Sequence, residues 1–321
     1  MKSKIICFTG LSLFFLFFSA SATAEENAPD EKQAKTALYK KTQAITNIPW
    51  YYFAAIDQYE HNIQKEEDNS EQLISIDIPD ELWFGVSNPG LTSEELITVS
   101  DGWGRDGDGD GLADKNNDED VLYSMAHWIN QYGNNKEDIK IALWNYYQRE
   151  LTVQTIMSIA KIYEKFGTIA LDKTDFPLPL HANYSYRNTW GDARGFGGRR
   201  IHEGTDIFAG YGVPVKATTY GVVEMKGWNK YGGWRIGIRD IHNHYHYFAH
   251  LNGYEKGINV GDVVEPGTVI GSVGATGYGP PGTSGKFPPH LHYGMYKDNG
   301  YSEWSFDPYP HLKRWERNAR N

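Results

Sequence analysis

The chain has 321 residues, enough for about two domains of ~150 residues each. Hydrophobic residues make up 40% of the sequence and charged residues 22%, which indicates a packed globular protein rather than a disordered one. The net charge of −10 argues against nucleic-acid binding, because such proteins neutralise phosphates with clustered lysine and arginine. The net charge does not exclude a neutral or anionic polymer as a ligand held in a groove. Aromatic residues make up 14% of the sequence, and they would suit binding surfaces for sugars or peptides as well as hydrophobic cores.

Residues 1–24 have the pattern of a secretory signal peptide. Lys2 and Lys4 give a positive start, an apolar run covers residues 5–18, and residues 22–24 read Ala-Thr-Ala, a small-x-small cleavage signal. We expect cleavage near Ala24 and a mature chain that is secreted or held at the cell wall. An uncleaved membrane anchor is the alternative, although the run is short for a span of ~20 apolar residues.

The only cysteine, Cys7, lies inside this leader. The mature chain is therefore expected to have no disulfide, no thiol nucleophile and no thiolate metal site. Any metal ion must be bound by histidine, aspartate or glutamate. No later segment is apolar enough to span a membrane, so we expect no membrane insertion of the mature chain.

The N-terminal half shows helical periodicity. Residues 25–44 are polar and charged and are expected to be a flexible arm or a frayed helix, whereas residues 45–168 should form a helical domain. Apolar residues recur at helical spacing, with glycine ending two of the segments, over residues 49–64, 118–133, 136–147 and 151–167.

The pattern changes after Gly167, where a linker at residues 169–174 leads into a second domain at residues 175–312 and a tail at 313–321. Short apolar runs between glycines predict strands over residues 213–218, 221–227, 234–240, 244–250, 268–274 and 290–296. The expected fold class is α+β with two domains: a helical N-terminal domain followed by a compact all-β domain.

Histidines of the predicted β domain occur in three groups whose spacing would place their side chains on one face of a strand. His202 and Asp206 are four apart, His290 and His292 alternate on one strand, and a third strand carries His244, His246 and His250. Alternate residues of a strand share a face, so each group would point to one side of the sheet. A lone histidine on a strand is usually structural or exposed. Three such groups together favour a metal site, in which two imidazoles and one carboxylate leave a zinc ion one open position for water.

The C-terminal half resembles the lysostaphin/LytM-type zinc peptidases (family M23). The resemblance covers about residues 175–312 and rests on the segments "HEGTDIFAGYGVPVKATTYGVV", "YFAHL", "VGDVVEPGTVIGSVGATG", "PPHLHYGMY" and "FDPYPHL". It implies an antiparallel β fold, one zinc ion per chain and hydrolysis of peptide bonds in bacterial peptidoglycan.

The resemblance also implies roles for particular residues. The zinc ligands would be His202, Asp206 and His292, while His250 and His290 would face the metal-bound water, orient it, take its proton or stabilise the oxyanion. His244 and His246 are expected to be flanking or exposed residues, and His242 and His311 have no assigned role.

An Asp-rich loop at residues 105–120 partly matches a calcium-binding loop. The expected ligands are Asp106, Asp108, Asp110, the backbone of Leu112, and Asp114. The twelfth position is Asn117 rather than glutamate, so a plain acidic turn is the alternative.

The pattern around this loop weakly resembles the lysozyme-like domains of lytic transglycosylases. By that resemblance the catalytic acid would fall on Glu60, at the end of the helix "IPWYYFAAIDQYEHNI". The segment that follows, "ELWFGVSNPG", departs from the family pattern. A glycan-binding remnant is therefore expected ahead of an active glycosidase.

Three functions follow from these observations. The first is a secreted zinc endopeptidase acting on peptidoglycan, which most resembles the sporulation-type L-Ala–D-Glu endopeptidases of spore formers. The second is a glycan-cleaving enzyme that uses Glu60, with the β domain as a targeting module. The third is a non-enzymatic wall-binding activator.

Overall fold

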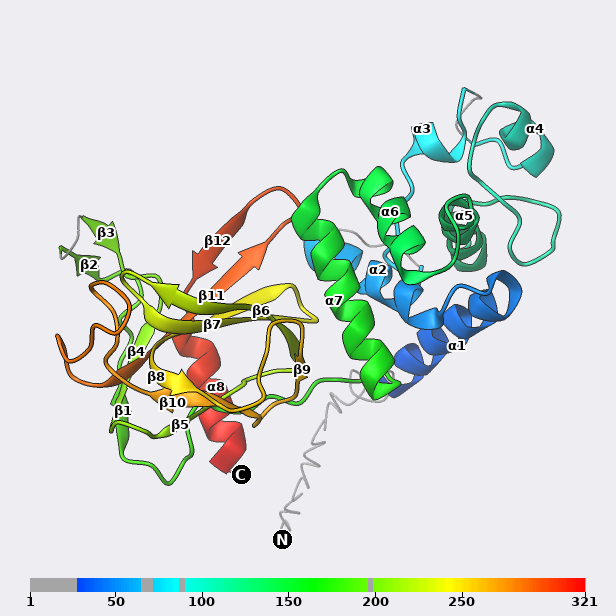
Figure 1. The fold of residues 1–321 in the computed structure, drawn as a ribbon. Coiled ribbons are helices and arrows are strands. Elements are labelled where there is room, and N and C mark those ends of the chain that lie inside the picture. The colour runs from blue at the N-terminus through cyan, green and yellow to red at the C-terminus, as the bar shows by residue number, and fades with distance from the viewer. Residues whose placement is uncertain (1–27, 65–71, 87–89, 196–198, 321) are drawn as a thin grey trace, which may run out of the picture.

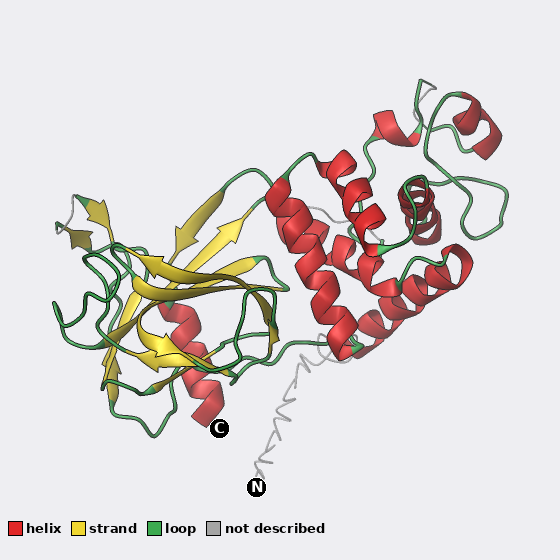
Figure 2. Cartoon of the chain, in the orientation of Figure 1, coloured by secondary structure: helices red, strands yellow, loops and turns green. Residues whose placement is uncertain are grey.

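The computed structural model describes residues 28–64, 72–86, 90–195 and 199–320. The N-terminal half is helical, and the C-terminal half is built on an antiparallel sheet that a final helix packs against (Figures 1 and 2). The expected signal peptide lies outside the described residues.

Helices predicted from apolar periodicity are confirmed in the N-terminal half. The helices described before the sheet are α1 (Ala28–Thr46), α2 (Trp50–Ile63), α3 (Asp80–Trp83), α4 (Glu94–Val99), α5 (Asp118–Asn130), α6 (Lys136–Tyr147) and α7 (Glu150–Phe166). Side chains of Asn117 and Asn135 accept backbone N–H groups at the starts of α5 and α6, which satisfies donors that a helix leaves unpaired. Gly167 ends α7 in the left-handed conformation at φ 68°, which glycine adopts without steric cost.

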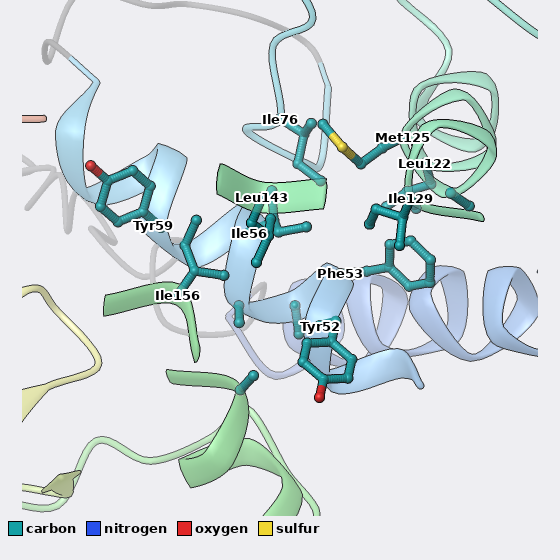
Figure 3. Close-up of a cluster of buried hydrophobic side chains, with 14 of the residues drawn as sticks. Tyr52, Phe53, Ile56, Tyr59, Ile76, Leu122, Met125, Ile129, Leu143 and Ile156 are labelled. Carbon is teal, nitrogen blue, oxygen red and sulfur yellow. The ribbon is translucent and has the colours of Figure 1, made fainter. Parts of the chain in front are cut away.

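One hydrophobic core holds these helices together. Figure 3 shows side chains from α2 meeting side chains from α5, α6 and α7. The labelled residues are at most 6% exposed: Tyr52, Phe53, Ile56, Tyr59, Ile76, Leu122, Met125, Ile129, Leu143 and Ile156.

The segment expected to be a flexible arm or a frayed helix forms, over residues 28–44, most of the packed helix α1. This helix packs against α2 and α5, and the buried Tyr39 hydroxyl donates a hydrogen bond to the buried carboxylate of Asp57. Lys35 also reaches Asp57, at 3.2 Å. The stripe that α1 buries is narrow and partly polar, which explains why the composition of this segment gave so little sign of packing.

The C-terminal half contains an antiparallel sheet, which confirms the predicted β architecture. Its strands run in the order β1-β4-β11-β8-β7-β6-β9; β10 pairs with β5 and β8, and β12 pairs with β11. The strands are β1 (Tyr184–Tyr186), β4 (Thr205–Ala209), β5 (Pro214–Lys216), β6 (Gly221–Asn229), β7 (Gly233–Asp240), β8 (His244–Tyr254), β9 (Val263–Val264), β10 (Val269–Val273), β11 (His290–Asp298) and β12 (Glu303–Phe306). A separate hairpin pairs β2 (Ala193–Arg194) with β3 (Arg200–Ile201).

The expected C-terminal tail is instead the end of a helix, α8 (Tyr309–Arg320). Leu312 and Trp315 are buried in the core of the sheet, and Glu316 accepts hydrogen bonds from the hydroxyls of Tyr184 and Tyr186 at 2.6 Å each. The segment is amphipathic but carries few apolar residues among many charges, and its low mean hydropathy made it read as a polar tail in the sequence.

Helix α7 joins the two halves. It packs against β6, β7 and β9 (Figure 1). The rings of Phe166 and Tyr220 meet edge to face, with centroids 4.9 Å apart. At its other end, Arg149 makes two hydrogen bonds with Asp298 of β11, at 2.7 and 2.8 Å. Asp298 is fully buried, so this ion pair fixes the β11–β12 hairpin to the helices.

Candidate metal centre and active site

Three side chains from different parts of the chain converge on one point of the sheet. His202 follows β3, Asp206 lies in β4, and His292 lies in β11 directly opposite Asp206. His202 Nε2 lies 2.9 Å from His292 Nδ1 and 3.0 Å from Asp206 Oδ1, and the last two atoms are 3.1 Å apart. The sequence-predicted ligand residues are therefore neighbours in space.

The donor atoms suit a metal ion. Ligands about 2.0–2.1 Å from a tetrahedral zinc ion lie roughly 3.3 Å apart, close to the separations found here. His202 Nδ1–H donates to the carbonyl oxygen of Thr189 at 2.7 Å, so Nε2 turns a lone pair toward Asp206. Acceptor atoms converging at such separations repel one another unless a cation lies between them. Burial would raise the pKa of Asp206, but the adjoining imidazole rings of His202 and His292 lower it far below its usual range, so the carboxylate is ionised.

Two residues that sequence reasoning missed orient this cluster. The Thr189 hydroxyl accepts the backbone N–H of Asp206 at 3.0 Å, while its carbonyl receives His202. Arg194 donates to the second carboxylate oxygen of Asp206 at 2.7 Å. Neither residue belongs to a recognisable local motif, because both act through contacts between segments distant in sequence.

His250 and His290 lie beside the cluster. Their ring centroids are 4.8 Å apart, and the ring of His250 is 5.9 Å from that of His292. His250 Nδ1–H donates to the carbonyl oxygen of Thr276 at 2.8 Å, and His290 Nδ1–H donates to that of Pro288 at 2.9 Å. Burial lowers the pKa of both rings, that of His250 to about 3, with a further contribution there from His290. Both imidazoles are thus neutral and keep an Nε2 lone pair.

A β-bulge decides which histidines of β8 share this face. Trp234 pairs with Leu251 but Ile236 pairs with Phe248, so residues 249 and 250 together oppose Arg235. His250 sits at φ 62° and turns onto the open face.

The prediction that His244 and His246 share a face with His250 is therefore wrong. His246 is fully buried on the opposite face, where its ring hydrogen-bonds with Asp240 at 2.9 Å and with the Tyr293 hydroxyl at 2.6 Å. It is also not the exposed or flanking residue that we expected. The bulge separates it from the metal cluster.

A groove of about 970 Å³ opens along this face. Its floor includes His202, Asp206 and His292, and its walls include His250 and His290. Aromatic side chains line much of the rest: Phe208, Tyr231, Tyr245, Tyr247, Tyr278, Phe287 and Tyr296. Such a groove has room for an extended peptide with a bond placed over the metal cluster.

The Asp-rich loop brings together a different set from the one expected. Carboxylate oxygens of Asp106, Asp108 and Asp120 lie within 4.8 Å of one another, whereas Asp110 and Asp114 lie outside that group. Asp120 belongs to α5 and was missed because it falls beyond the twelve-residue loop pattern. Asp106 already accepts backbone N–H groups of Gly109 and Gly111. Calcium binding through Asp106, Asp108, Asp110, Leu112 and Asp114 stays a prediction.

Glu60 lies in the last turn of α2, away from the groove. It is partly buried, and the Tyr147 hydroxyl donates a hydrogen bond to it at 2.5 Å. Burial raises the pKa of Glu60 to about 7 against the lowering effect of that hydrogen bond.

A sheet that turns two imidazoles and a carboxylate to one point, beside two further imidazoles in a groove, is the arrangement of a metal-dependent hydrolase. The family model of peptidase family M23 matches residues 200–305, which contain all five of these side chains. The L-Ala–D-Glu endopeptidase of Bacillus subtilis (strain 168) is 57% identical over 317 residues, covering 97% of each chain. The chain belongs to peptidase family M23, a family of zinc metallopeptidases.

More distant relatives share the C-terminal half. Lysostaphin of Staphylococcus simulans is 36% identical over 115 residues, which cover 35% of this chain and 22% of that protein. A solved structure of lysostaphin from the same organism matches with 31% identity and a TM-score of 0.37, over 46% of this chain and 56% of that one. Among the described residues, no helix has the length and apolar character needed to span a membrane.

Proposed function

We propose that this chain is a zinc-dependent endopeptidase that hydrolyses the bond between L-Ala and D-Glu in the stem peptides of peptidoglycan. The observation that carries the proposal is the convergence of His202, Asp206 and His292 beside His250 and His290 in one open groove. The choice of bond is supported by the 57% identity with the L-Ala–D-Glu endopeptidase of B. subtilis along nearly the whole chain.

In this proposal His202, Asp206 and His292 hold one zinc ion. When bound, zinc supplies an acidified water and polarises the scissile carbonyl. Cysteine is absent from the chain after residue 7, and the donor set of two nitrogens and one carboxylate suits zinc without it. Arg194 and Thr189 keep Asp206 oriented through the two hydrogen bonds described above.

In this proposal His250 and His290 serve as general base and general acid. Each has its Nδ1–H fixed on a backbone carbonyl, so each presents an unprotonated Nε2 that accepts the proton of the attacking water. The same nitrogen then returns that proton to the leaving amine. While neutral, each ring has its single N–H engaged with a backbone carbonyl, so it can donate to an oxyanion only after it has taken up a proton at Nε2.

Matched histidine variants test the proposal. Purified peptidoglycan is digested with the wild type, His292→Ala and His290→Ala, the products are identified by mass spectrometry, and the metal content of each protein is measured. His292→Ala should lose both metal and activity. His290→Ala should keep the metal and lose activity by about 10²–10⁴-fold, as expected when a general base is removed.

The exposed His242 provides the control, because His242→Ala removes an imidazole outside the groove. It should digest peptidoglycan at the wild-type rate. Hydrolysis that persists both in chelator and in His292→Ala would refute the zinc mechanism. Products with new sugar ends rather than a new D-Glu amino terminus would refute the peptidase assignment.

The same proposal extends to the organisation of the protein. We infer a signal peptide at residues 1–24, a lysozyme-like helical domain at 45–168, and a peptidase domain at 175–312. Secretion would place the enzyme at its peptidoglycan substrate, and a role in sporulation accords with the resemblance noted in the sequence. A role for calcium in securing the Asp-rich loop would be detected as a rise in melting temperature with added CaCl₂ that Asp106→Asn removes.

Glycan cleavage is the second candidate, and one observation favours it. A glycosidic acid must carry a proton, and a carboxyl group with a pKa of about 7, such as Glu60, is about half protonated at neutral pH. In that case Glu60→Gln would abolish the release of sugar ends while His292→Ala would not.

A further inference from the structure

The groove carries positive charge in a protein whose net charge is −10. Its lining contains Arg194, Arg200, Arg235 and Lys286 against Glu203, Asp206 and Glu303. Two of those three carboxylates are engaged elsewhere, since Asp206 belongs to the metal cluster and Glu303 pairs with Arg239 at 2.8 Å. The remaining cations therefore face the groove with little compensation.

Arg235 stands out among the arginines of this wall. Arg239 lies four residues further along β7, on the same face, and is enclosed by Glu224 and Glu303, at 3.2 and 2.8 Å. Arg194 pairs with Asp206. Among the described residues no ion pair joins Arg235 to a carboxylate. Its Nε atom, like that of Arg194, is buried with no hydrogen-bond partner, and its guanidinium hydrogen-bonds with the Tyr247 side chain. An unsatisfied buried donor is unfavourable unless a ligand completes it.

Arg235 also lies in line with the metal cluster. In the sheet, Asp206 pairs with His292, His292 pairs with Ala249, and the bulge places Ala249 opposite Arg235. Two strand spacings of ~4.8 Å separate β7 from β11. Arg235 and His292 line the same groove. The Tyr247 ring fills the space between, 5.9 Å from the Arg235 guanidinium carbon and 5.8 Å from the His292 ring.

A glutamate that supplies the amine of a scissile bond has two carboxyl groups, of which only one continues the chain. The other remains as a free carboxylate, three to five bonds from the scissile carbonyl carbon and hence within roughly 4–6 Å of it. We propose that Arg235 is a specificity-determining residue whose guanidinium binds this free carboxylate, so that the enzyme selects stem peptides with D-Glu over those in which the same carboxyl is amidated. This inference rests on the proposed function and names the chemical group by which its substrate is chosen.

Charge-assisted hydrogen bonds explain why an arginine would make this selection. The guanidinium presents several donors in a plane that matches a carboxylate, whereas a carboxamide offers a single acceptor and no charge. The neighbouring Lys286 and Arg200 donate to the backbone oxygen and the hydroxyl of Tyr278, at 2.7 and 2.9 Å. They add positive potential at the mouth of the groove, while Arg235 supplies the direct contact.

The test uses two synthetic stem peptides that differ only in that carboxyl group, one the free acid and the other the amide. The wild type should cleave the acid with a kcat/KM about 10–100-fold higher than that for the amide, as expected for a hydrogen-bonded charge pair. Arg235→Gln should remove this preference, mainly by raising KM for the acid, so that the acid and the amide are cleaved with similar kcat/KM. Arg235→Lys should restore part of the preference.

Arg317→Gln is the matched control, because it removes an exposed arginine of α8 outside the groove and should keep the wild-type preference. Equal cleavage of both peptides by the wild type would overturn the inference and leave the proposed function intact. Cleavage of neither peptide would contradict the proposed function itself. A preference that survives in a folded Arg235→Gln variant would also overturn the inference, and if that variant does not fold, Arg235→Lys and the wild-type comparison decide it.

Discussion

Loss of the Arg149–Asp298 ion pair should destabilise the protein strongly, and removal of Arg149 should cost more free energy of unfolding than removal of the Asp298 charge. Arg149→Met removes the guanidinium that holds Asp298 through two hydrogen bonds. Asp298 is 0% exposed, and its carboxylate would keep only a long contact of 3.4 Å with the amide of Asn243. An uncompensated buried charge costs about 3–5 kcal/mol. Because the Arg149 side chain is 23% exposed and its field is partly screened, we expect about 2–3 kcal/mol.

The opposite change should be milder. Asp298→Asn leaves Arg149 with access to water, so the expected loss is about 1 kcal/mol. The double variant should be less destabilised than the sum of the two single variants, because the group left unpaired in Arg149→Met is then neutral.

Urea unfolding followed by tryptophan fluorescence measures each free energy of unfolding. The control is Lys32→Met, which breaks an ion pair with Asp172 whose side chains are 38% and 70% exposed and should change stability by less than about 0.5 kcal/mol. The reasoning fails if Arg149→Met matches this control, or if Asp298→Asn is the more destabilising of the two single changes.

Two further predictions concern the pH dependence of stability and the affinity for zinc. Since the pKa of Glu60 is raised from 4.5 to about 7 in the folded protein, the folded state binds more protons between these values, and the free energy of unfolding should fall as pH rises from 4.5 to 7. Solvent screening limits the fall to about 2 kcal/mol, and a pH profile of Glu60→Gln as steep as that of the wild type would contradict it. Gly204→Ala would place a Cβ 2.7 Å from Cε1 of His292, so zinc affinity should fall by about 10–100-fold in a competitive chelator titration. Gly227→Ala, whose added Cβ would meet no atom within 4 Å and which lies outside the groove lining, should leave zinc affinity unchanged.

Much of the metal cluster could be predicted from local sequence. The absence of cysteine after residue 7 restricts ligands to histidine and carboxylates, and alternation along a strand places His290 and His292 on one face. Glycines bounding short apolar runs identified the main strands of the sheet. These features depend on neighbours in sequence, so they are readable without knowledge of the fold.

The remaining features depend on neighbours in space. A bulge opposite Arg235 turns His250 toward the metal cluster and leaves His246 in the core, against the simple alternation of a strand. The ion pair between Arg149 and Asp298 joins segments 149 residues apart.

The end of the chain shows the same limit. Helix α8 is amphipathic in sequence, but its few apolar side chains read as a polar tail until the sheet is seen to offer the surface on which Leu312 and Trp315 are buried. The sequence by itself thus determined the kinds of ligand, the strands and the family. Only the tertiary structure decided which side chains meet in the groove, because strand register, bulges and helix docking are properties of pairs of segments rather than of either segment alone.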